Sequence, residues 1–139
     1  TFQANEESLR RRTGEWLKAN TPPSSTVAME AIGYQGYYSE RRVIDFAGLV
    51  SPAVVEIHRQ SKSNAETFQQ ILKQLKPDYL VLRSFEVERN QHFEGGAMFE
   101  SDQQRELFFS TYDPVAQFSA MDPVTYGDSI AHLKVYKRK

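Results

Sequence analysis

The chain contains no cysteine among its 139 residues, and this single absence removes several kinds of chemistry. Disulfide frameworks, thiolate nucleophiles and cysteine-based zinc sites are all excluded. The absence leaves the redox compartment open, because a domain without cysteine can fold on either side of a membrane.

Excess charge and long apolar runs are also missing. The 17 basic and 18 acidic residues leave a formal net charge of −1, and such a balance does not favour nucleic acid as a partner. No apolar run approaches the roughly 20 residues that cross a bilayer. The sequence begins at Thr1 rather than at methionine, so we expect it to be excised from a longer protein.

Complete catalytic and cofactor motifs are absent as well. There is no Gly-x-Ser-x-Gly elbow and no Walker loop, and the histidines His58, His92 and His132 lack the spacing of metal ligands. We predict His58 on the exposed side of a helix and His132 within the last strand. We therefore expect neither a metal nor a cofactor.

The stretch from Gly33 to Gly36 invites a dinucleotide-binding interpretation. It supplies two of the three glycines that the fingerprint needs, and the following acidic residue, Asp45, comes too early. The bulky Tyr34 and Tyr37 would crowd a phosphate. We predict instead that these glycines let the chain turn beside a sheet.

The amino-acid composition is typical of a folded protein. With 40% hydrophobic and 12% aromatic residues, the chain can build one core, so we predict a single domain over residues 1–139. Apolar residues at helical spacing predict a helix over residues 5–19, with Leu9, Thr13, Trp16 and Leu17 on one face. Predicted strands cover residues 26–31, 42–46, 78–83, 115–121 and 130–136.

Helix start signals complete the pattern. Ser51-Pro52 is a favoured N-cap and first position, while Ser63 with Glu66 and Ser101 with Gln104 resemble capping boxes. Because helices separate the first three strands, we predict a three-layer α/β fold. Its small sheet would be mostly parallel and flanked by helices, with an antiparallel C-terminal extension. Residues 85–100 show no periodicity, and we predict a structureless loop there, either functional or mobile.

Candidate contact residues gather around the first two strands. Asp45 interrupts an apolar strand, so its carboxylate needs partners. These are backbone N–H groups of the following turn, or Arg41 or Arg42; the alternative is a ligand or sugar. Glu30 would lie beside Asp45 on the neighbouring strand, where a carboxylate pair could do acid-base work on glycosides. Tyr34 and Tyr37 are predicted to pack at the core and rim, or to stack on a sugar.

One segment also carries a family likeness. Residues 16–52, WLKANTPPSSTVAMEAIGYQGYYSERRVIDFAGLVSP, resemble the C-terminal extracytoplasmic domain of bacterial polytopic membrane glycosyltransferases. These enzymes are related to the protein O-mannosyltransferases and the aminoarabinose transferase, and they use a polyprenyl-phosphate sugar donor. Pro77-Asp78-Tyr79-Leu80-Val81 continues the likeness.

The resemblance implies a place and a role. It implies a non-catalytic accessory domain of an integral membrane protein, on the extracytoplasmic face of the bacterial plasma membrane. The family's catalytic acids lie in a loop to which nothing here corresponds. The implied partners are the transmembrane region of the same polypeptide and a glycan or protein acceptor. The contact surface would comprise Glu30, Tyr34, Tyr37, Arg41, Arg42, Asp45 and the 85–100 loop.

Two alternatives belong to other classes. One is a free-standing nucleotide- or sugar-binding domain, or an enzyme, with its site at the strand ends near Gly33 and Asp45. The other is a protein-interaction module.

Overall fold

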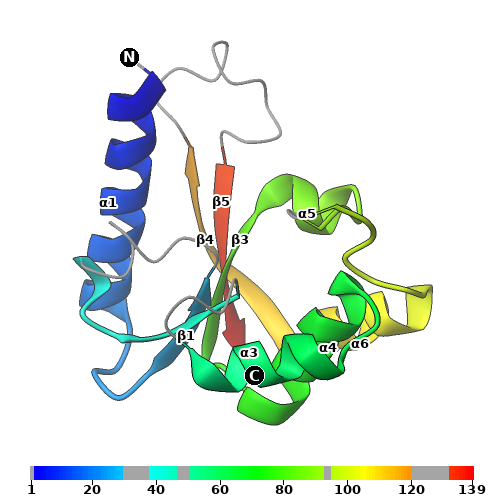
Figure 1. Ribbon diagram of the computed structural model, residues 1–139. Coiled ribbons are helices and arrows are strands. Elements are labelled where there is room, and N and C mark those ends of the chain that lie inside the picture. The colour runs from blue at the N-terminus through cyan, green and yellow to red at the C-terminus, as the bar shows by residue number, and fades with distance from the viewer. Residues whose placement is uncertain (1, 30–37, 47–50, 93–94, 120–131) are drawn as a thin grey trace.

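The computed structural model describes residues 2–29, 38–46, 51–92, 95–119 and 132–139, and the side chains from residue 8 onward. Within this part a five-stranded sheet runs through the centre, with helices on both sides (Figure 1). The strand order is β2-β1-β3-β5-β4. The strands are β1 (Thr26–Met29), β2 (Arg42–Asp45), β3 (Tyr79–Arg83), β4 (Tyr112–Ser119) and β5 (His132–Arg138).

The two halves of the sheet differ in direction, as predicted. Strand β1 pairs in parallel with β2 on one side and with β3 on the other. Strand β5 then pairs antiparallel with both β3 and β4. The α/β class, the parallel core and the antiparallel extension are therefore confirmed.

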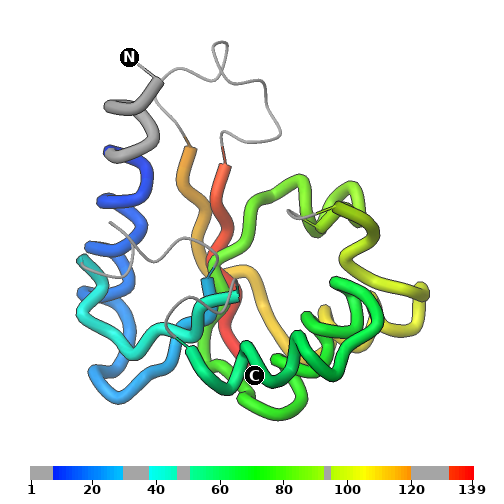
Figure 2. The backbone as a smooth tube through the Cα atoms, viewed as in Figure 1, coloured from blue at the N-terminus to red at the C-terminus, as the bar shows by residue number. Residues whose placement is uncertain are grey.

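One helix covers the first face of the sheet. The helix α1 (Phe2–Asn20) runs along one side of the sheet (Figure 2), and it buries Leu9, Thr13 and Leu17 as predicted. Trp16 meets Phe118 of β4 edge to face, with 6.1 Å between ring centroids. The apolar cluster beneath α1 also contains Val27, Met29, Tyr79, Val81, Leu133 and Val135.

Four further helices of the described part cover the opposite face. They are α3 (Pro52–Gln60), α4 (Asn64–Leu75), α5 (Ser84–Glu88) and α6 (Asp102–Thr111). Strand residues of opposite parity, such as Leu80 and Leu82, point into this layer and join Phe68, Ile71 and Phe108. Because successive strand side chains alternate between faces, the buried residues Tyr79 to Leu82 show that β3 is covered on both sides.

The helix starts follow the predicted capping chemistry in two of three cases. Ser63 Oγ accepts a hydrogen bond from Glu66 N, and Ser101 Oγ accepts one from Gln104 N. Before α3, Pro52 occupies the first helical position, but the side chain of Ser51 does not cap the helix. Its hydroxyl is used elsewhere, as described below.

The predicted structureless loop over residues 85–100 was wrong at its beginning. Residues Ser84–Glu88 form α5, whose start is stabilised by Glu86 Oε1 accepting a hydrogen bond from Arg83 N at 2.9 Å. Val87 is buried against the core on the same side as α4 and α6. The helix has only five residues, and such a short element presents too little periodicity to be recognised from sequence.

A second difference concerns the start of β4. The strand begins at Tyr112, directly after α6, whereas the sequence pattern placed its start at residue 115. Pro114 lies inside it, and the pairing shifts between Pro114 and Ala116. Strand β4 is at the edge of the sheet, where a proline and a bulge are tolerated because no neighbour needs the missing N–H group.

The packing of the aromatic cluster predicts that the stability of the fold depends much more on Phe108 than on its neighbour in the sequence. Phe108 is 2% exposed, and its ring lies 5.2 to 6.1 Å from those of Phe68, Phe99, Tyr112 and Tyr136. We expect Phe108→Ala to lower the free energy of unfolding by about 3–5 kcal/mol, because it leaves a cavity. The neighbouring Phe109, which is 39% exposed, is the matched control. Urea denaturation measures both variants, and equal losses would contradict the packing described.

Candidate functional site at the strand ends

The carboxyl ends of the parallel strands form the candidate site. Strand β2 lies beside β1 on one side. After β2 the chain crosses over to β3, which lies on the other side of β1. Open α/β sheets bind ligands at such a reversal, outside the carboxyl ends of the strands. We call this region the strand-end site. It comprises Asp45 at the end of β2 with Phe46 after it, Arg83 at the end of β3 with Ser84 to Glu86 after it, and the histidines His58 and His92.

Asp45 is in the predicted strand-end position, but its side chain is fully buried. It lies directly opposite Met29 of β1. Its backbone N–H donates to Ser51 Oγ at 3.0 Å, which explains why this hydroxyl does not cap α3. The two residues thus fix the geometry in which the chain leaves β2 and enters α3.

Arg41 holds the end of α1 rather than the strand-end site. Its Nη2 donates to the carbonyl oxygens of Lys18 and Thr21, each at 2.8 Å, and its Nε donates to Thr21 Oγ1 at 2.9 Å. Thr21 Oγ1 in turn donates to Leu17 O at 2.6 Å. A cation at a helix carboxyl end satisfies free carbonyl groups and complements the helix dipole.

The structure does not bring the predicted arginines to Asp45. Arg42 is exposed at the amino end of β2, where it lies opposite Thr26. It is three residues from Asp45, a distance of about 10 Å along a strand. The predicted contact residues Glu30, Tyr34 and Tyr37, with the turn glycines Gly33 and Gly36, lie outside the described residues.

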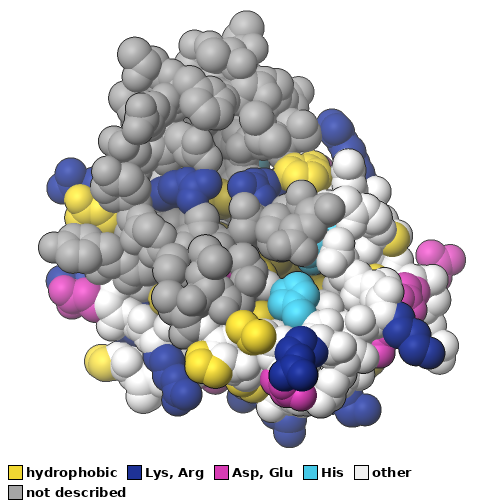
Figure 3. All heavy atoms as spheres, in the orientation of Figure 1, with side chains coloured by type: hydrophobic (Ala, Val, Ile, Leu, Met, Phe, Trp, Pro, Cys, Tyr) yellow, Lys and Arg dark blue, Asp and Glu magenta, His cyan; other side chains and the backbone are white. Residues whose placement is uncertain are grey.

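Two histidines that lie far apart in the sequence meet near this edge. His58 is half-buried, and its Nε2 lies 2.9 Å from Phe46 O, so the predicted exposed position was wrong. His92 is 6% exposed. Burial, with a smaller contribution from the charge of His58, lowers the pKa of His92 to about 4. Histidine side chains are visible beside apolar ones in the middle of this face (Figure 3).

Polar groups after β3 complete the region. Ser84 is buried, and its hydroxyl has no hydrogen-bond partner in the part of the chain that the structure describes. Glu86 is also buried. Sequence reasoning missed these groups and the electrostatic influence of His58 on His92, because only the packing of α3 and of the segment after β3 against the sheet brings them close.

The strand-end site offers hydrogen bonding more than acid-base chemistry. A histidine with a pKa of about 4 is neutral near pH 7, and Asp45 has no exposed surface. Among the described residues no group of three or more His, Asp or Glu side chains is placed to hold a metal ion. A neutral imidazole and a hydroxyl can each donate and accept hydrogen bonds, which suits a ligand rich in hydroxyl groups.

These features define an α/β domain with a mixed sheet and a polar region at the ends of its parallel strands. The chain belongs to the family described as a domain of unknown function, DUF8728, whose model matches residues 2–136. No curated protein and no solved structure matches the chain. Within the described part, none of the helices combines the length and the apolar character needed to span a membrane.

Replacement of the two neighbouring arginines separates a structural role from a surface one. We expect Arg41→Gln to lower the free energy of unfolding by about 1–3 kcal/mol, because it frees carbonyl groups at the end of α1. Arg42→Gln removes the same charge from an exposed position, and we expect a change within about 0.5 kcal/mol. Urea denaturation measures both, and a similar effect of the two substitutions would argue against the helix-capping role.

The buried imidazole predicts a pH dependence of stability. Because the pKa of His92 in the folded state is about 4, below the value of about 6.5 in unfolded chains, the unfolded state binds the proton more tightly. The stabilisation is complete above about pH 6.5 and is lost as the pH falls toward 4. We expect His92→Gln to flatten the fall in unfolding free energy between pH 7 and 4.5. His132→Gln is the control, and an unchanged slope in His92→Gln would refute the assignment.

Proposed function

We propose that this domain is the non-catalytic extracytoplasmic accessory domain of a membrane glycosyltransferase that uses a polyprenyl-phosphate sugar donor. One observation carries the proposal: the segment that resembles that family is the segment that builds the parallel half of this fold. In this role the domain supports the catalytic membrane region and helps to position the acceptor.

The residues that carry the likeness make contacts that stabilise the fold. Trp16 packs against β4, and Thr21 closes α1 and receives Arg41. The Ser51-Pro52 pair joins β2 to α3 through Asp45. These contacts support a scaffold role for the Trp16–Pro52 segment, in agreement with an accessory domain.

The second segment of the likeness makes the central strand. Pro77 O accepts a hydrogen bond from Tyr112 Oη at 2.8 Å, and Asp78 Oδ2 accepts hydrogen bonds from Thr26 N and Thr26 Oγ1. These bonds fix β3 against β1 and against the start of β4. The likeness therefore follows the framework of the sheet from its first strand to its third.

The polar strand-end site supports the acceptor side of the proposal. A buried hydroxyl at Ser84 without a partner among the described residues is a group that can hydrogen-bond a glycan or a peptide. Partners would be the transmembrane region of the same polypeptide and this acceptor.

The test begins with the parent open reading frame and continues with the parent protein. We expect membrane helices upstream of Thr1, and an alkaline phosphatase fused after Lys139 should be active outside the cytoplasm. Deletion of the domain should raise the KM for acceptor or abolish transfer from a polyprenyl-phosphate sugar. The parent protein carrying Lys137→Gln, a substitution at an exposed position, is the control. A reading frame without upstream membrane helices would end the proposal.

The same strand-end groups favour one other candidate, a free-standing nucleotide- or sugar-binding domain. Titration of the chain with nucleotides, S-adenosylmethionine and sugars separates the two candidates. Saturable binding that Asp45→Asn abolishes while the circular dichroism spectrum stays unchanged would support the free-standing domain.

A further inference from the structure

A pocket lies between α4 and α6, away from the strand-end site. It has a volume of about 470 Å³, within the range of small-molecule sites. Lys76 and Arg138 flank it, and both lie near Asp78 at the amino end of β3. The carboxyl end of β3, with Arg83 and Ser84, is at the other edge of the sheet. The pocket is therefore independent of the function proposed above.

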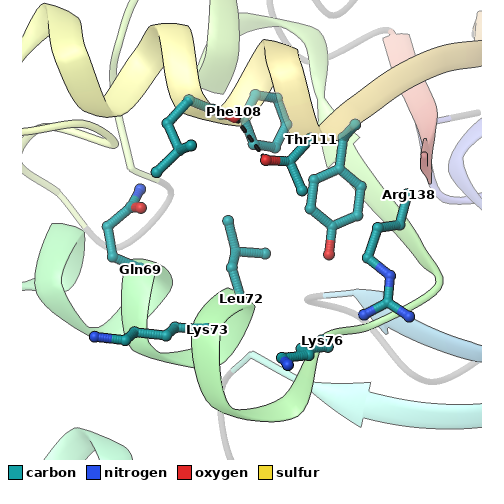
Figure 4. Close-up of a pocket in the computed structure, with 9 residues that line it drawn as sticks. Gln69, Leu72, Lys73, Lys76, Phe108, Thr111 and Arg138 are labelled. Atoms are coloured by element: carbon teal, nitrogen blue, oxygen red, sulfur yellow. Dashed lines mark hydrogen bonds between the residues drawn. The ribbon is translucent and has the colours of Figure 1, made fainter.

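Apolar side chains form most of the pocket wall. Leu72 of α4 lies in its middle and faces Phe108 of α6 (Figure 4). Leu107 also lines the pocket and is 62% exposed, which is the highest value among the large exposed apolar residues of the described part. Such a wall takes the apolar body of a ligand, because burial of that surface is favourable.

Three cationic side chains also line the pocket, and we call them its rim. Lys73 and Lys76 come from the end of α4, and Arg138 comes from the end of β5. Arg138 Nη2 lies 3.5 Å from Asp78 Oδ1. No ion pair of either lysine with another described residue is present, so three cations and one carboxylate leave this rim positive. Among the residues that the structure describes, no acidic side chain lines the pocket.

An unused hydrogen-bond donor lies at the other end of the pocket. Gln69 lines the pocket, and its Nε2 is buried without a hydrogen-bond partner in the described part of the chain. Figure 4 shows Gln69 at one end and Arg138 at the other, with Leu72 between them. Buried amide groups normally have a partner, so this donor marks an end where a polar ligand atom or a water molecule fits.

We propose that this pocket binds a small amphipathic anion, with an apolar chain or ring against Leu72, Leu107 and Phe108. A single carboxylate or phosphate head group would lie at Lys76 and Arg138. The apolar wall alone would accept any hydrophobic molecule. The positive rim selects an anion, because a cationic or neutral head group gains nothing from it.

The probe is decanoate, added to the 139-residue chain below its critical micelle concentration and followed by backbone amide shifts in nuclear magnetic resonance spectra. We expect saturable shifts at Gln69, Leu72 and Thr111. Decyl phosphate should bind as well, and its affinity relative to decanoate identifies the preferred head group. 1-Decanol, which lacks the charge, and acetate, which lacks the chain, should bind at least tenfold more weakly.

Matched variants assign the two parts of the pocket. Lys76→Gln should weaken decanoate binding at least threefold, whereas Lys137→Gln, an equal loss of charge at an exposed position outside the pocket, should not. Leu107→Gln should weaken it similarly, whereas Val115→Gln, at a residue 43% exposed elsewhere, should not. All four positions are exposed, so the fold is expected to survive each change.

Four results would overturn the proposal. The first is the absence of saturable shifts below the critical micelle concentration. The second is binding of 1-decanol as tight as that of decanoate. The third is an equal effect of Lys76→Gln and Lys137→Gln on decanoate binding. The fourth is sedimentation data that assign the shifts to self-association of the chain through this face.

Discussion

The structure depends on the two-sided burial of β3. Its residues Tyr79, Leu80, Val81 and Leu82 are each at most 5% exposed, so neither face of the strand can meet water. One layer must be supplied by α1 and the other by α3, α4 and α6. Asp78 secures the start of this strand to Thr26 of β1 and to Arg138 of β5, and the three-layer arrangement follows from this requirement.

The same arrangement separates the two edges of the sheet chemically. At the carboxyl ends of the parallel strands, polar groups such as Asp45, Ser84 and His92 are buried among the connections. At the amino end of β3, the last turn of α4 and the end of β5 place cations beside an apolar pocket. A single sheet therefore carries a hydrogen-bonding region at one edge and a positive, apolar one at the other.

Several residues that look functional in the sequence serve the fold. Arg41 binds the end of α1, and Ser51 binds the backbone of Asp45. Each satisfies a backbone group that would otherwise be unpaired, which costs about 1–3 kcal/mol when the group is buried. Polar residues at strand ends are thus ambiguous in a sequence, because turns and ligands need the same chemistry.

The sequence by itself determined the local elements. Apolar spacing predicted α1, Ser63 and Ser101 predicted two helix starts, and the apolar run before Arg83 predicted the central strand. These signals act over a few residues, so they can be read without the fold. The sequence could not determine that α5 forms, that His58 and His92 lie near each other, or that α4, α6 and β5 enclose a pocket. Those features arise from contacts between distant segments, and only the tertiary packing decides them.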